Sequence, residues 1–390
     1  MEARSLPEAL KLIMEQRGCS QNQLARDLKK GQPWISNVIR GKAGLEFARV
    51  IKILSRVGWE VVIRPKSENS EPVKRREFVA AAASVMFVPS PKVGPDQDPA
   101  YVGELARSVQ SGRYALGSGA IAATAIRHIQ RIVPTAMGSR DRALHEAASE
   151  LAVQTVWTLS EARRLDAGEN IGKLALKLAQ LSKSPGVQSR AYGALAQTKI
   201  ERHKAQRQPD RALMYAREGM KVREVSDVRQ AWMRLRKGWS LAQVRGQEKQ
   251  ARDEIENVRG LLQDSRGFGQ SPVSVADMTG CIGLALNDLG AHEEAQTTLN
   301  EAVALLGNSA PDLQSHFLAQ QIIAALKTSQ VSLAANRMLH LARVAPLVNA
   351  PRLDEDLQAV LALSATWSTV PSVRDARDQL KTVTVRNIRT

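Results

Sequence analysis

Cysteine and aromatic residues are scarce in this chain of 390 residues. The two cysteines, Cys19 and Cys281, lie far apart and in no CxxC arrangement, so neither a disulfide framework nor a zinc site is supported. Aromatic residues make up 4% of the sequence and apolar residues 43%, a mix that fits Ala- and Leu-rich helices better than aromatic-rich sheet. We therefore expect an almost entirely α-helical protein.

Long hydrophobic runs are also missing. The longest uncharged one, residues 79–88, is about half of the roughly 20 residues that a transmembrane helix needs. Arg75 and Arg76 precede it, as in a twin-arginine export signal. That signal stands at an N-terminus, whereas this run lies inside the chain. We therefore expect a connector helix over 73–86 and a cytoplasmic protein that binds no membrane.

Sequence motifs of catalysis are missing as well. The six histidines are scattered without an HExxH or similar spacing, and there is no GxSxG, Walker loop or close Cys/His arrangement. Residues 117–122, GSGAIA, have the GxGxxA spacing of some dinucleotide sites, but no apolar strand precedes them. The expectation is a protein without enzyme activity, metal site or cofactor.

Positive charge is abundant and uneven. The net charge is +16, and residues 1–66 hold thirteen Lys or Arg against six Asp or Glu. This is a net +7 in about a sixth of the chain, and it leaves +9 for the other residues. An anionic partner is expected, with nucleic acid first and an acidic membrane surface second.

The basic segment has the pattern of short helices joined by tight turns. Apolar residues recur at helical spacing over 5–17, 21–30, 32–40 and 45–57. Ser20 and Gln23 have the spacing of a capping box, and Pro33 suits the first turn of the third helix. Such an arrangement predicts a helix-turn-helix, which can place its second helix in the major groove of DNA.

Residues 5–64 resemble the Xre family of helix-turn-helix regulators, through "CSQNQLARDL" followed by "PWISNVIRGK". The resemblance implies a lambda-repressor-like domain, over residues 1–66, that binds double-stranded DNA at a palindromic operator. It implies a phosphate contact from the second helix, base contacts from the third, and backbone contacts around the closing glycine. The predicted DNA-binding residues are Gln21, Gln32, Pro33, Trp34, Ser36, Asn37, Arg40 and Lys42. The alternative is a purely structural hairpin in which Trp34 is a packed residue.

A short β-branched segment, residues 59–64, follows this domain. One isolated strand is not stable alone, and some small Xre-type regulators pair such a strand across a dimer. We therefore predict a homodimer that uses this strand. Prolines then mark residues 67–99 as a linker that contains the connector helix.

Residues 100–390 read as helix after helix with short loops, the pattern of a helical repeat. Positions 283, 286, 290, 295, 299 and 302 have the spacings of a tetratricopeptide repeat, and positions 242, 246, 251 and 255 repeat that order 44 residues earlier. The expected fold class is thus all-α, a helix-turn-helix domain with one short strand followed by a TPR-like solenoid. By repeat register, its concave surface holds Arg236, Gln243, Asp277, Asn287 and Asp288. The alternative is that these are ordinary solvated polar residues.

An Xre-type domain before a TPR-like array resembles regulators of actinomycetes and, more distantly, peptide-responsive quorum-sensing regulators of other Gram-positive bacteria. The resemblance implies a dimeric transcription factor whose array binds a signal: a peptide, a small molecule or a protein. The alternative is a scaffold whose solenoid recruits a protein while the N-terminal domain tethers it to DNA.

Overall fold

The computed structural model describes residues 6–28, 30–40, 59–65, 83–89, 94–201, 206–264 and 272–388. The chain divides into two compact units, Met1–Tyr101 and Val102–Thr390. Each unit is described by itself below. From the sequence, the helical array is expected to begin at residue 100.

Three short helices form the described core of the first unit: α1 (Leu6–Arg17), α2 (Gln21–Asp27) and α3 (Gln32–Ile39). The capping box at the start of α2 is present, because the Ser20 hydroxyl accepts from the Gln23 main-chain N–H and the Gln23 amide oxygen accepts from the Ser20 N–H, both at 3.3 Å. Before it, Gly18 adopts a φ of +59°, a turn conformation that favours glycine. The fourth helix expected over 45–57 lies outside the described residues.

Apolar side chains from all three helices meet in one small core, where α3 packs against both α1 and α2. They occur at helical spacing, so each helix turns one stripe inward and leaves its polar residues outside. The fully buried members are Leu10, Ile13, Leu24, Leu28, Ile35 and Val38.

Two strands of the first unit correct the predicted connector helix. Strands β1 (Trp59–Pro65) and β2 (Ala83–Pro89) pair antiparallel, from Trp59 opposite Pro89 to Pro65 opposite Ala83. Residues 83–86 are therefore extended where the sequence predicts helix, and residues 73–82 lie outside the described part. The physical reason is that β2 gives the main chain of β1 a hydrogen-bonding partner, which outweighs the helix propensity of an apolar run. The partner of β1 thus lies in the same chain, and the argument for a strand pair across a dimer is removed.

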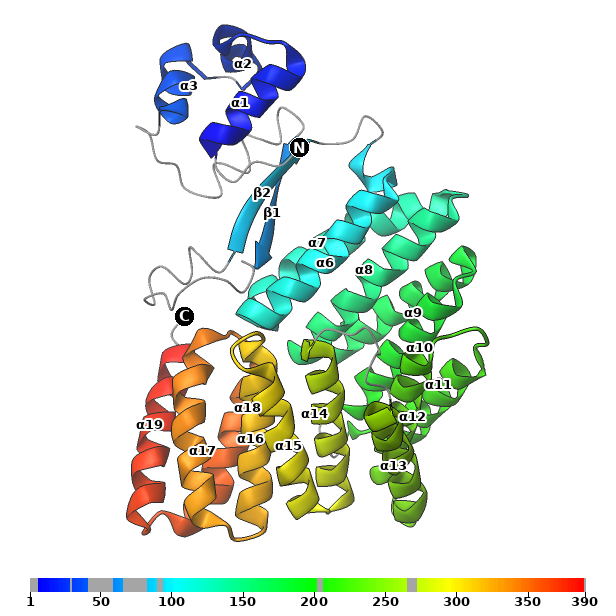
Figure 1. The fold of residues 1–390 in the computed structure, drawn as a ribbon, viewed down its shortest axis with the longest axis vertical. Coiled ribbons are helices and arrows are strands. Elements are labelled where there is room, and N and C mark those ends of the chain that lie inside the picture. The colour runs from blue at the N-terminus through cyan, green and yellow to red at the C-terminus, as the bar shows by residue number, and fades with distance from the viewer. Residues whose placement is uncertain are drawn as a thin grey trace. The chain divides into compact units, whose positions relative to one another are not determined.

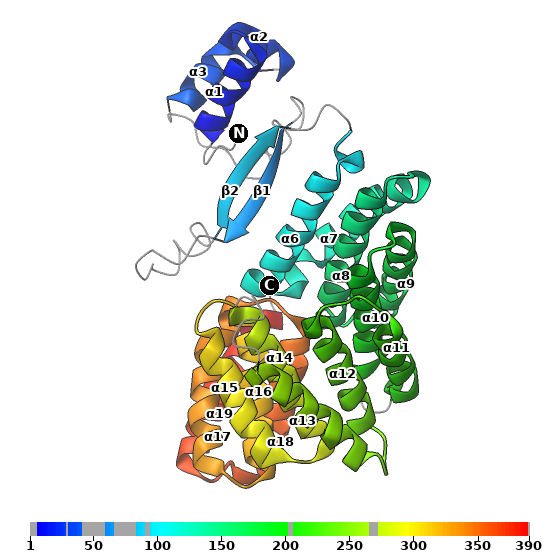
Figure 2. The same ribbon diagram turned by 45° about the vertical axis from the view of Figure 1, so that its right-hand side comes forward.

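From residue 99 onward, helices follow one another in antiparallel pairs (Figures 1 and 2), and most of them pack on the next helix of the chain. The first helix of one pair also packs on the first helix of the next, from α8 through to α18. The bounds are α6 Pro99–Leu116, α7 Ser118–Gly138, α8 Arg142–Glu161, α9 Leu165–Ser182, α10 Pro185–Ile200, α11 Pro209–Lys221, α12 Asp227–Ala242, α13 Glu248–Asp264, α14 Pro272–Leu289, α15 His292–Leu306, α16 Pro311–Lys327, α17 Val331–Val344, α18 Pro351–Leu363 and α19 Pro371–Ile388, with short 3-10 turns η2 Pro95–Gln97, η4 Ala345–Leu347 and η5 Ser364–Trp367. The arrangement is a TPR-like solenoid, and the prediction of such a helical array is confirmed.

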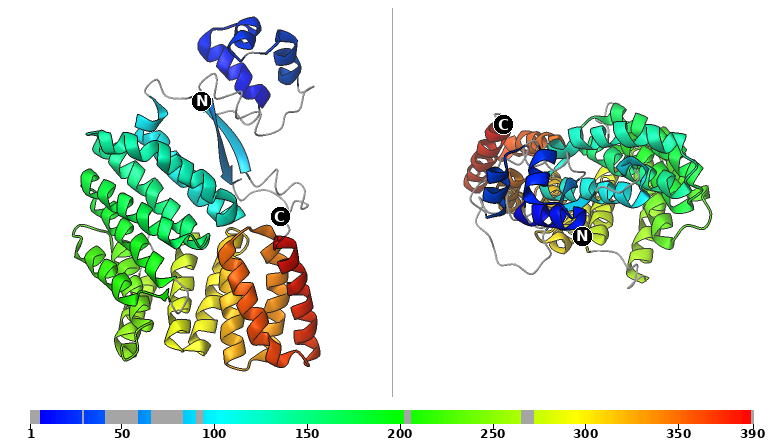
Figure 3. Two further views of the ribbon diagram at one scale, coloured as in Figure 1. Left: turned by 180° about the vertical axis from the view of Figure 1, so that it is seen from behind. Right: turned by 90° about the horizontal axis from the view of Figure 1, so that it is seen from above.

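The repeat spacing has a clear cause in two adjacent pairs. Gly246 lies in the loop between α12 and α13, and Gly290 follows the end of α14; their φ of +83° and +85° is a backbone conformation that glycine adopts without strain. Within the second pair, a Cβ on Gly283 would lie 2.6 Å from the Leu299 side chain, so only glycine lets α14 and α15 approach this closely. The pairs are stacked in chain order, cyan to red, when the molecule is seen from behind (Figure 3).

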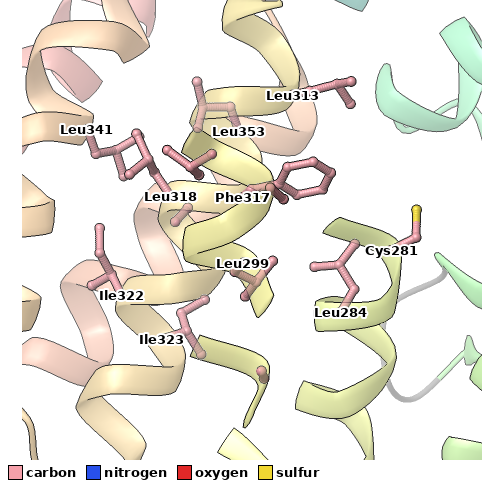
Figure 4. Close-up of a cluster of buried hydrophobic side chains, with 14 of the residues drawn as sticks. Cys281, Leu284, Leu299, Leu313, Phe317, Leu318, Ile322, Ile323, Leu341 and Leu353 are labelled. Carbon is pink, nitrogen blue, oxygen red and sulfur yellow. The ribbon is translucent and has the colours of Figure 1, made fainter. Parts of the chain in front are cut away.

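The hydrophobic core of the solenoid is continuous from α10 to α19. Figure 4 shows the Phe317 ring extending from α16 toward α14, with Leu284 and Cys281 on the facing helix. Gly280 of α14 lies against this ring, so close that a Cβ there would overlap it. Small residues on one helix therefore make room for large apolar residues of its neighbour.

The turn between α6 and α7 contacts the loop that leads into α18. The main-chain N–H of Asn349 donates to the Leu116 carbonyl at 2.9 Å, and the Gly119 N–H donates to the Asn349 carbonyl at 2.8 Å. A Cβ on Gly117, whose φ is +85°, would lie 2.5 Å from that Asn349 oxygen. We call this contact of Leu116, Gly117, Gly119 and Asn349 the clasp. It gives the GSGAIA segment a structural role, because its glycines make room for a loop of the same unit.

Candidate functional site

The predicted DNA-binding residues that the structure describes lie at the start of α2 and along α3 as far as its C-terminal cap, Arg40. The Gln32 amide donates to the Gln21 amide oxygen at 3.1 Å, which joins the first residues of the two helices. Gln32, Pro33, Asn37 and Arg40 are exposed, and Gln21, Trp34 and Ser36 are half-buried, whereas Lys42 lies outside the described residues. Amide side chains can pair bidentately with adenine, so this surface has groups suited to base reading.

Trp34 is partly covered by a neighbouring lysine. The Lys30 ammonium lies 5.8 Å from the centre of the Trp34 ring, within the range of a cation–π contact. Lys30 is itself positioned by its main-chain N–H, which donates to the Ala25 carbonyl at 2.8 Å and closes the end of α2. The half-buried ring therefore has a structural contact of its own.

A cavity lies inside the solenoid, lined by the first helix of every pair from α6 to α18. Its space amounts to about 900 Å³, a figure that includes open solvent at the mouth. The lining residues are Gln110, Arg113, Tyr114, Gln154, Trp157, Glu161, Arg190, Gly193, Gln197, Glu201, Arg229, Trp232, Met233, Arg236, Ser274, Asp277, Cys281, Leu284, Leu313, His316, Phe317 and Arg352.

Arg236 stands at the aromatic side of this cavity. Its guanidinium lies 5.1–5.6 Å from the ring centres of Trp157, Trp232 and Trp239 and donates to the Cys281 sulfur at 3.8 Å. The side chain is only 5% exposed. Cation–π contacts to three rings, of which Trp239 is buried and the other two are half-buried, hold it in place.

Two buried arginines tie the far ends of the solenoid together through one carboxylate. Arg113 of α6 forms an ion pair with Glu161 of α8, and Arg352 of α18 lies 3.5 Å from the same carboxylate. Arg352 also lies 3.3 Å from Asp312 and 3.8 Å from Glu201. Breaking such a buried network by removing one partner is costly, because it leaves an uncompensated charge.

The excess of carboxylates at this end shifts the pKa of Asp312. Burial and the nearby Glu161 carboxylate raise the pKa of Asp312 to about 7, against the lowering effect of Arg352. Burial lowers the pKa of Arg352, but the surrounding carboxylates raise it by more, so its net pKa lies above the ordinary value. The Asp312 carboxyl is therefore partly protonated near neutral pH.

The predicted ligand residues divide between two places. Arg236 and Asp277 line the central cavity, and Gln243, Asn287 and Asp288 line a neighbouring pocket. Asp277 is half-buried, and burial raises its pKa.

Asp288 is already engaged by other side chains of this chain. Its carboxylate accepts from the Trp239 indole at 2.8 Å, from the Gln243 amide at 2.9 Å and from Arg207 at 2.9 Å. Asn287 donates to the Gln320 carbonyl at 3.2 Å. Trp239 also contacts Arg236. The hydrogen bonds of Asp288 therefore help to position an aromatic ring beside the central cavity, and the Asp288 carboxylate is not free.

Several lining residues were not predicted from the sequence, among them Arg229, Gln154, Gln197 and Arg352. A usable signal was present, because Gln154, Trp157 and Glu161 stand at the i, i+3, i+7 spacing of one helix face. Polar and aromatic residues on the helix face that turns toward the inside of the solenoid indicate that this face lines a cavity. The sequence alone does not show which face of each helix turns inward, so the cavity could not be assigned from this spacing.

In the described part of the chain, no group of three or more His, Cys, Asp or Glu side chains is placed to hold a metal ion. Among the same residues, no helix is both long and apolar enough to cross a membrane.

No protein-family model matches the chain, and no curated protein matches its sequence. Its fold is similar to that of a solved Rap protein complexed with competence and sporulation factor, with a TM-score of 0.50 and 9% identity over 93% of this chain and 88% of the other. A solved PlcR of Bacillus thuringiensis in complex with the peptide PapR7 and DNA aligns with a TM-score of 0.39 and 11% identity, over 97% and 99% of the two chains. The first likeness shows the fold, a helical array of the TPR-like kind.

Proposed function

We propose that this protein is a sequence-specific DNA-binding regulator whose helical solenoid binds a signalling ligand that modulates DNA binding. The observation that carries the proposal is the cavity lined by the first helix of every pair from α6 to α18. A ligand there touches the whole array at once. The Rap protein of similar fold was solved with competence and sporulation factor bound, which supports a signal-binding role for such an array.

The position of the cavity also suggests how a bound ligand changes the conformation of the solenoid. The clasp and the Arg113–Glu161–Arg352 network hold the first and last helix pairs together. A ligand that binds better to one spacing of these helices shifts the array toward that spacing, and one that binds both equally shifts nothing. The proposed regulator works as a homodimer on a palindromic operator in the cytoplasm, so that a change in the array alters the placement of its two N-terminal domains.

DNA binding is proposed for the surface formed by the start of α2 and the exposed side of α3. Exposed Gln32, Asn37 and Arg40 provide two amides and one guanidinium, and the net +7 of residues 1–66 provides the long-range attraction. Arginine there neutralises phosphate, and amides read base edges.

The test is a gel-shift assay with the full chain and the DNA upstream of its own gene, with and without cell extract. Release of the DNA by extract indicates a ligand-responsive regulator, whereas a supershifted complex indicates a protein-recruiting scaffold. Failure to shift this DNA, or any competing operator selected from random sequence, contradicts the proposal.

Asn37→Ala tests the base-reading surface separately. We expect a loss of roughly 1–3 kcal/mol in specific affinity, the value of one good bidentate base contact, with little change in non-specific affinity. The matched control is Asn336→Ala on the exposed face of α17, which should change neither. Equal losses of specific and non-specific affinity would remove Asn37 from the base-reading residues.

A further inference from the structure

Arg229 of α12 lines the cavity as a cation without a counter-ion. Trp232 follows it one turn later, and Arg236 follows after seven residues, about 10 Å along the helix axis. The Arg229 side chain is half-buried, and among the described residues it forms no ion pair. A cation that is partly withdrawn from water costs free energy, and a bound anion would lower that cost.

A second guanidinium adds to the positive charge around Arg229. Burial and the nearby Arg190 of α10 together lower the pKa of Arg229 to about 10, against the raising effect of Glu150. Glu150 is already engaged, because it pairs with Arg190 at 2.6 Å and accepts from the Gln154 amide at 2.9 Å. The Arg190 side chain is 24% exposed. Two accessible guanidiniums on helices that pack together, with a single carboxylate near them, are suited to a doubly charged oxyanion such as phosphate.

Two aromatic rings border the cavity next to this basic pair. Trp157 of α8 and Trp232 of α12 line it, and both indoles are half-buried. The Arg236 guanidinium lies 5.4 Å and 5.1 Å from their ring centres, so the two rings border the same part of the cavity. A planar ring of a bound molecule can stack on such indoles.

One carboxylate in this part of the cavity is open to hydrogen-bond donors. Asp277 of α14 lines the cavity and is half-buried. Among the described residues, its side chain accepts only from the Cys281 thiol, a weak donor, at 3.8 Å. The same thiol lies 3.8 Å from the Arg236 guanidinium, which places Asp277 near the two indoles. A molecule with two neighbouring N–H donors can satisfy both oxygens of this carboxylate.

We propose that the ligand of this cavity is a guanine nucleotide, with its phosphate on Arg190 and Arg229 and the N–H edge of its base on Asp277. The base stacks on Trp232. Arg229 lies about 10 Å along α12 from Arg236, which is the arginine near Asp277, and a nucleotide likewise carries its phosphate and the polar edge of its base at opposite ends. Guanine offers a ring N–H and an amino group side by side, whereas adenine offers one amino group. This inference rests on the proposed ligand-binding function of the solenoid.

The experiment is equilibrium dialysis of the full-length protein against GMP, AMP, guanosine and ribose phosphate, each titrated separately. We expect GMP to bind about tenfold more tightly, or better, than each of the other three, because a site built for hydrogen bonds rejects molecules that lack them. Guanosine lacks the phosphate, ribose phosphate lacks the base, and AMP lacks the paired N–H donors.

Variants assign the contacts to individual side chains. Arg229→Gln should weaken GMP binding about tenfold or more and leave the affinity for guanosine unchanged, because guanosine has no phosphate. Arg229→Lys keeps the charge and should retain most of the GMP binding, which guards against misfolding. Asp277→Asn should remove the preference for GMP over AMP. Arg234→Gln is the matched control and should change nothing, because Arg234 lies on the same helix but pairs with Glu254 at 3.4 Å outside the cavity.

The outcomes separate the inference from the function beneath it. Equal binding of guanosine and GMP would show that the phosphate is not recognised, and equal binding of ribose phosphate and GMP would show that the base is not recognised. Equal binding of AMP and GMP would show that Asp277 does not read the base, so each of these three results overturns the inference. If none of the four molecules binds while extract still releases the DNA, the ligand belongs to another class, and only the inference fails. If extract has no effect either, the proposed ligand-binding function fails as well.

Discussion

Replacing Gly117 with alanine tests the clasp between the α6–α7 turn and the loop before α18. Gly117 has a φ of +85°, and an added Cβ would lie 2.5 Å from the Asn349 carbonyl oxygen. Real Cβ atoms almost never approach an oxygen so closely, so the Asn349 loop must move. Movement breaks the hydrogen bonds from Asn349 to Leu116 and from Gly119 to Asn349.

The magnitude follows from two contributions. A non-glycine residue held at the φ of +85° and ψ of 162° of Gly117 costs about 1–3 kcal/mol, and each lost hydrogen bond costs about 0.5–1.5 kcal/mol. We therefore expect Gly117→Ala to destabilise the solenoid by about 2–6 kcal/mol in total. Gly290 is the control for a positive φ without a clash, because its φ is also +85° but nothing lies within 4 Å of its added Cβ. Gly290→Ala should cost only about 1–2 kcal/mol.

The assay combines urea unfolding with hydrogen–deuterium exchange followed by mass spectrometry. The unfolding midpoint should fall further for Gly117→Ala than for Gly290→Ala, and faster exchange should be confined to peptides that contain Leu116 to Gly119 and Asn349. Equal midpoint shifts in the two variants, with unchanged exchange at Asn349, would refute the clasp as an energetic link between the ends of the solenoid.

Three further predictions concern buried ionisable groups. The pKa of Asp312 is raised from 3.8 to about 7 in the folded protein. The stability that this shift contributes is therefore complete below pH 3.8 and is lost as the pH rises through about 7. Asp312→Asn should remove this pH dependence, so that the urea midpoint of the variant falls less than that of the wild type between these two pH values. Glu169→Gln removes the carboxylate that pairs with the fully buried Lys199 and should cost about 3 kcal/mol or more in unfolding free energy. Lys199→Met should cost less, because Glu169 keeps its ion pair with Lys173 at 3.1 Å. A larger loss of unfolding free energy for Lys199→Met than for Glu169→Gln would contradict this account. Burial raises the pKa of the Cys281 thiol to about 12, so iodoacetamide at neutral pH should modify Cys281 only after unfolding in urea. Labelling is measured by mass spectrometry, and rapid labelling of Cys281 in the folded protein would refute this prediction.

The sequence by itself determined the helical character of the chain and the positions of several helix ends. Ser20 and Gln23 specify the start of α2 because a capping box is a local interaction within one turn. Gly246 and Gly290 specify the turns of two successive pairs because glycine alone adopts their φ without strain. Apolar spacing of 3.6 residues then predicted the helices and their succession, since this pattern also depends only on neighbours along the chain.

Only the tertiary structure decided which distant residues meet. Residues 83–86 became strand because β1 lies beside them, and an apolar run alone does not distinguish a helix from a strand that has a partner. Arg113, Glu161 and Arg352 come from helices at opposite ends of the array, and no spacing along the sequence relates them. Asp288 of α14 accepts a hydrogen bond from Trp239 of α12, a pairing that no spacing along the sequence specifies. The cavity thus arises from the packing of successive helix pairs, which the sequence pattern within each pair does not specify.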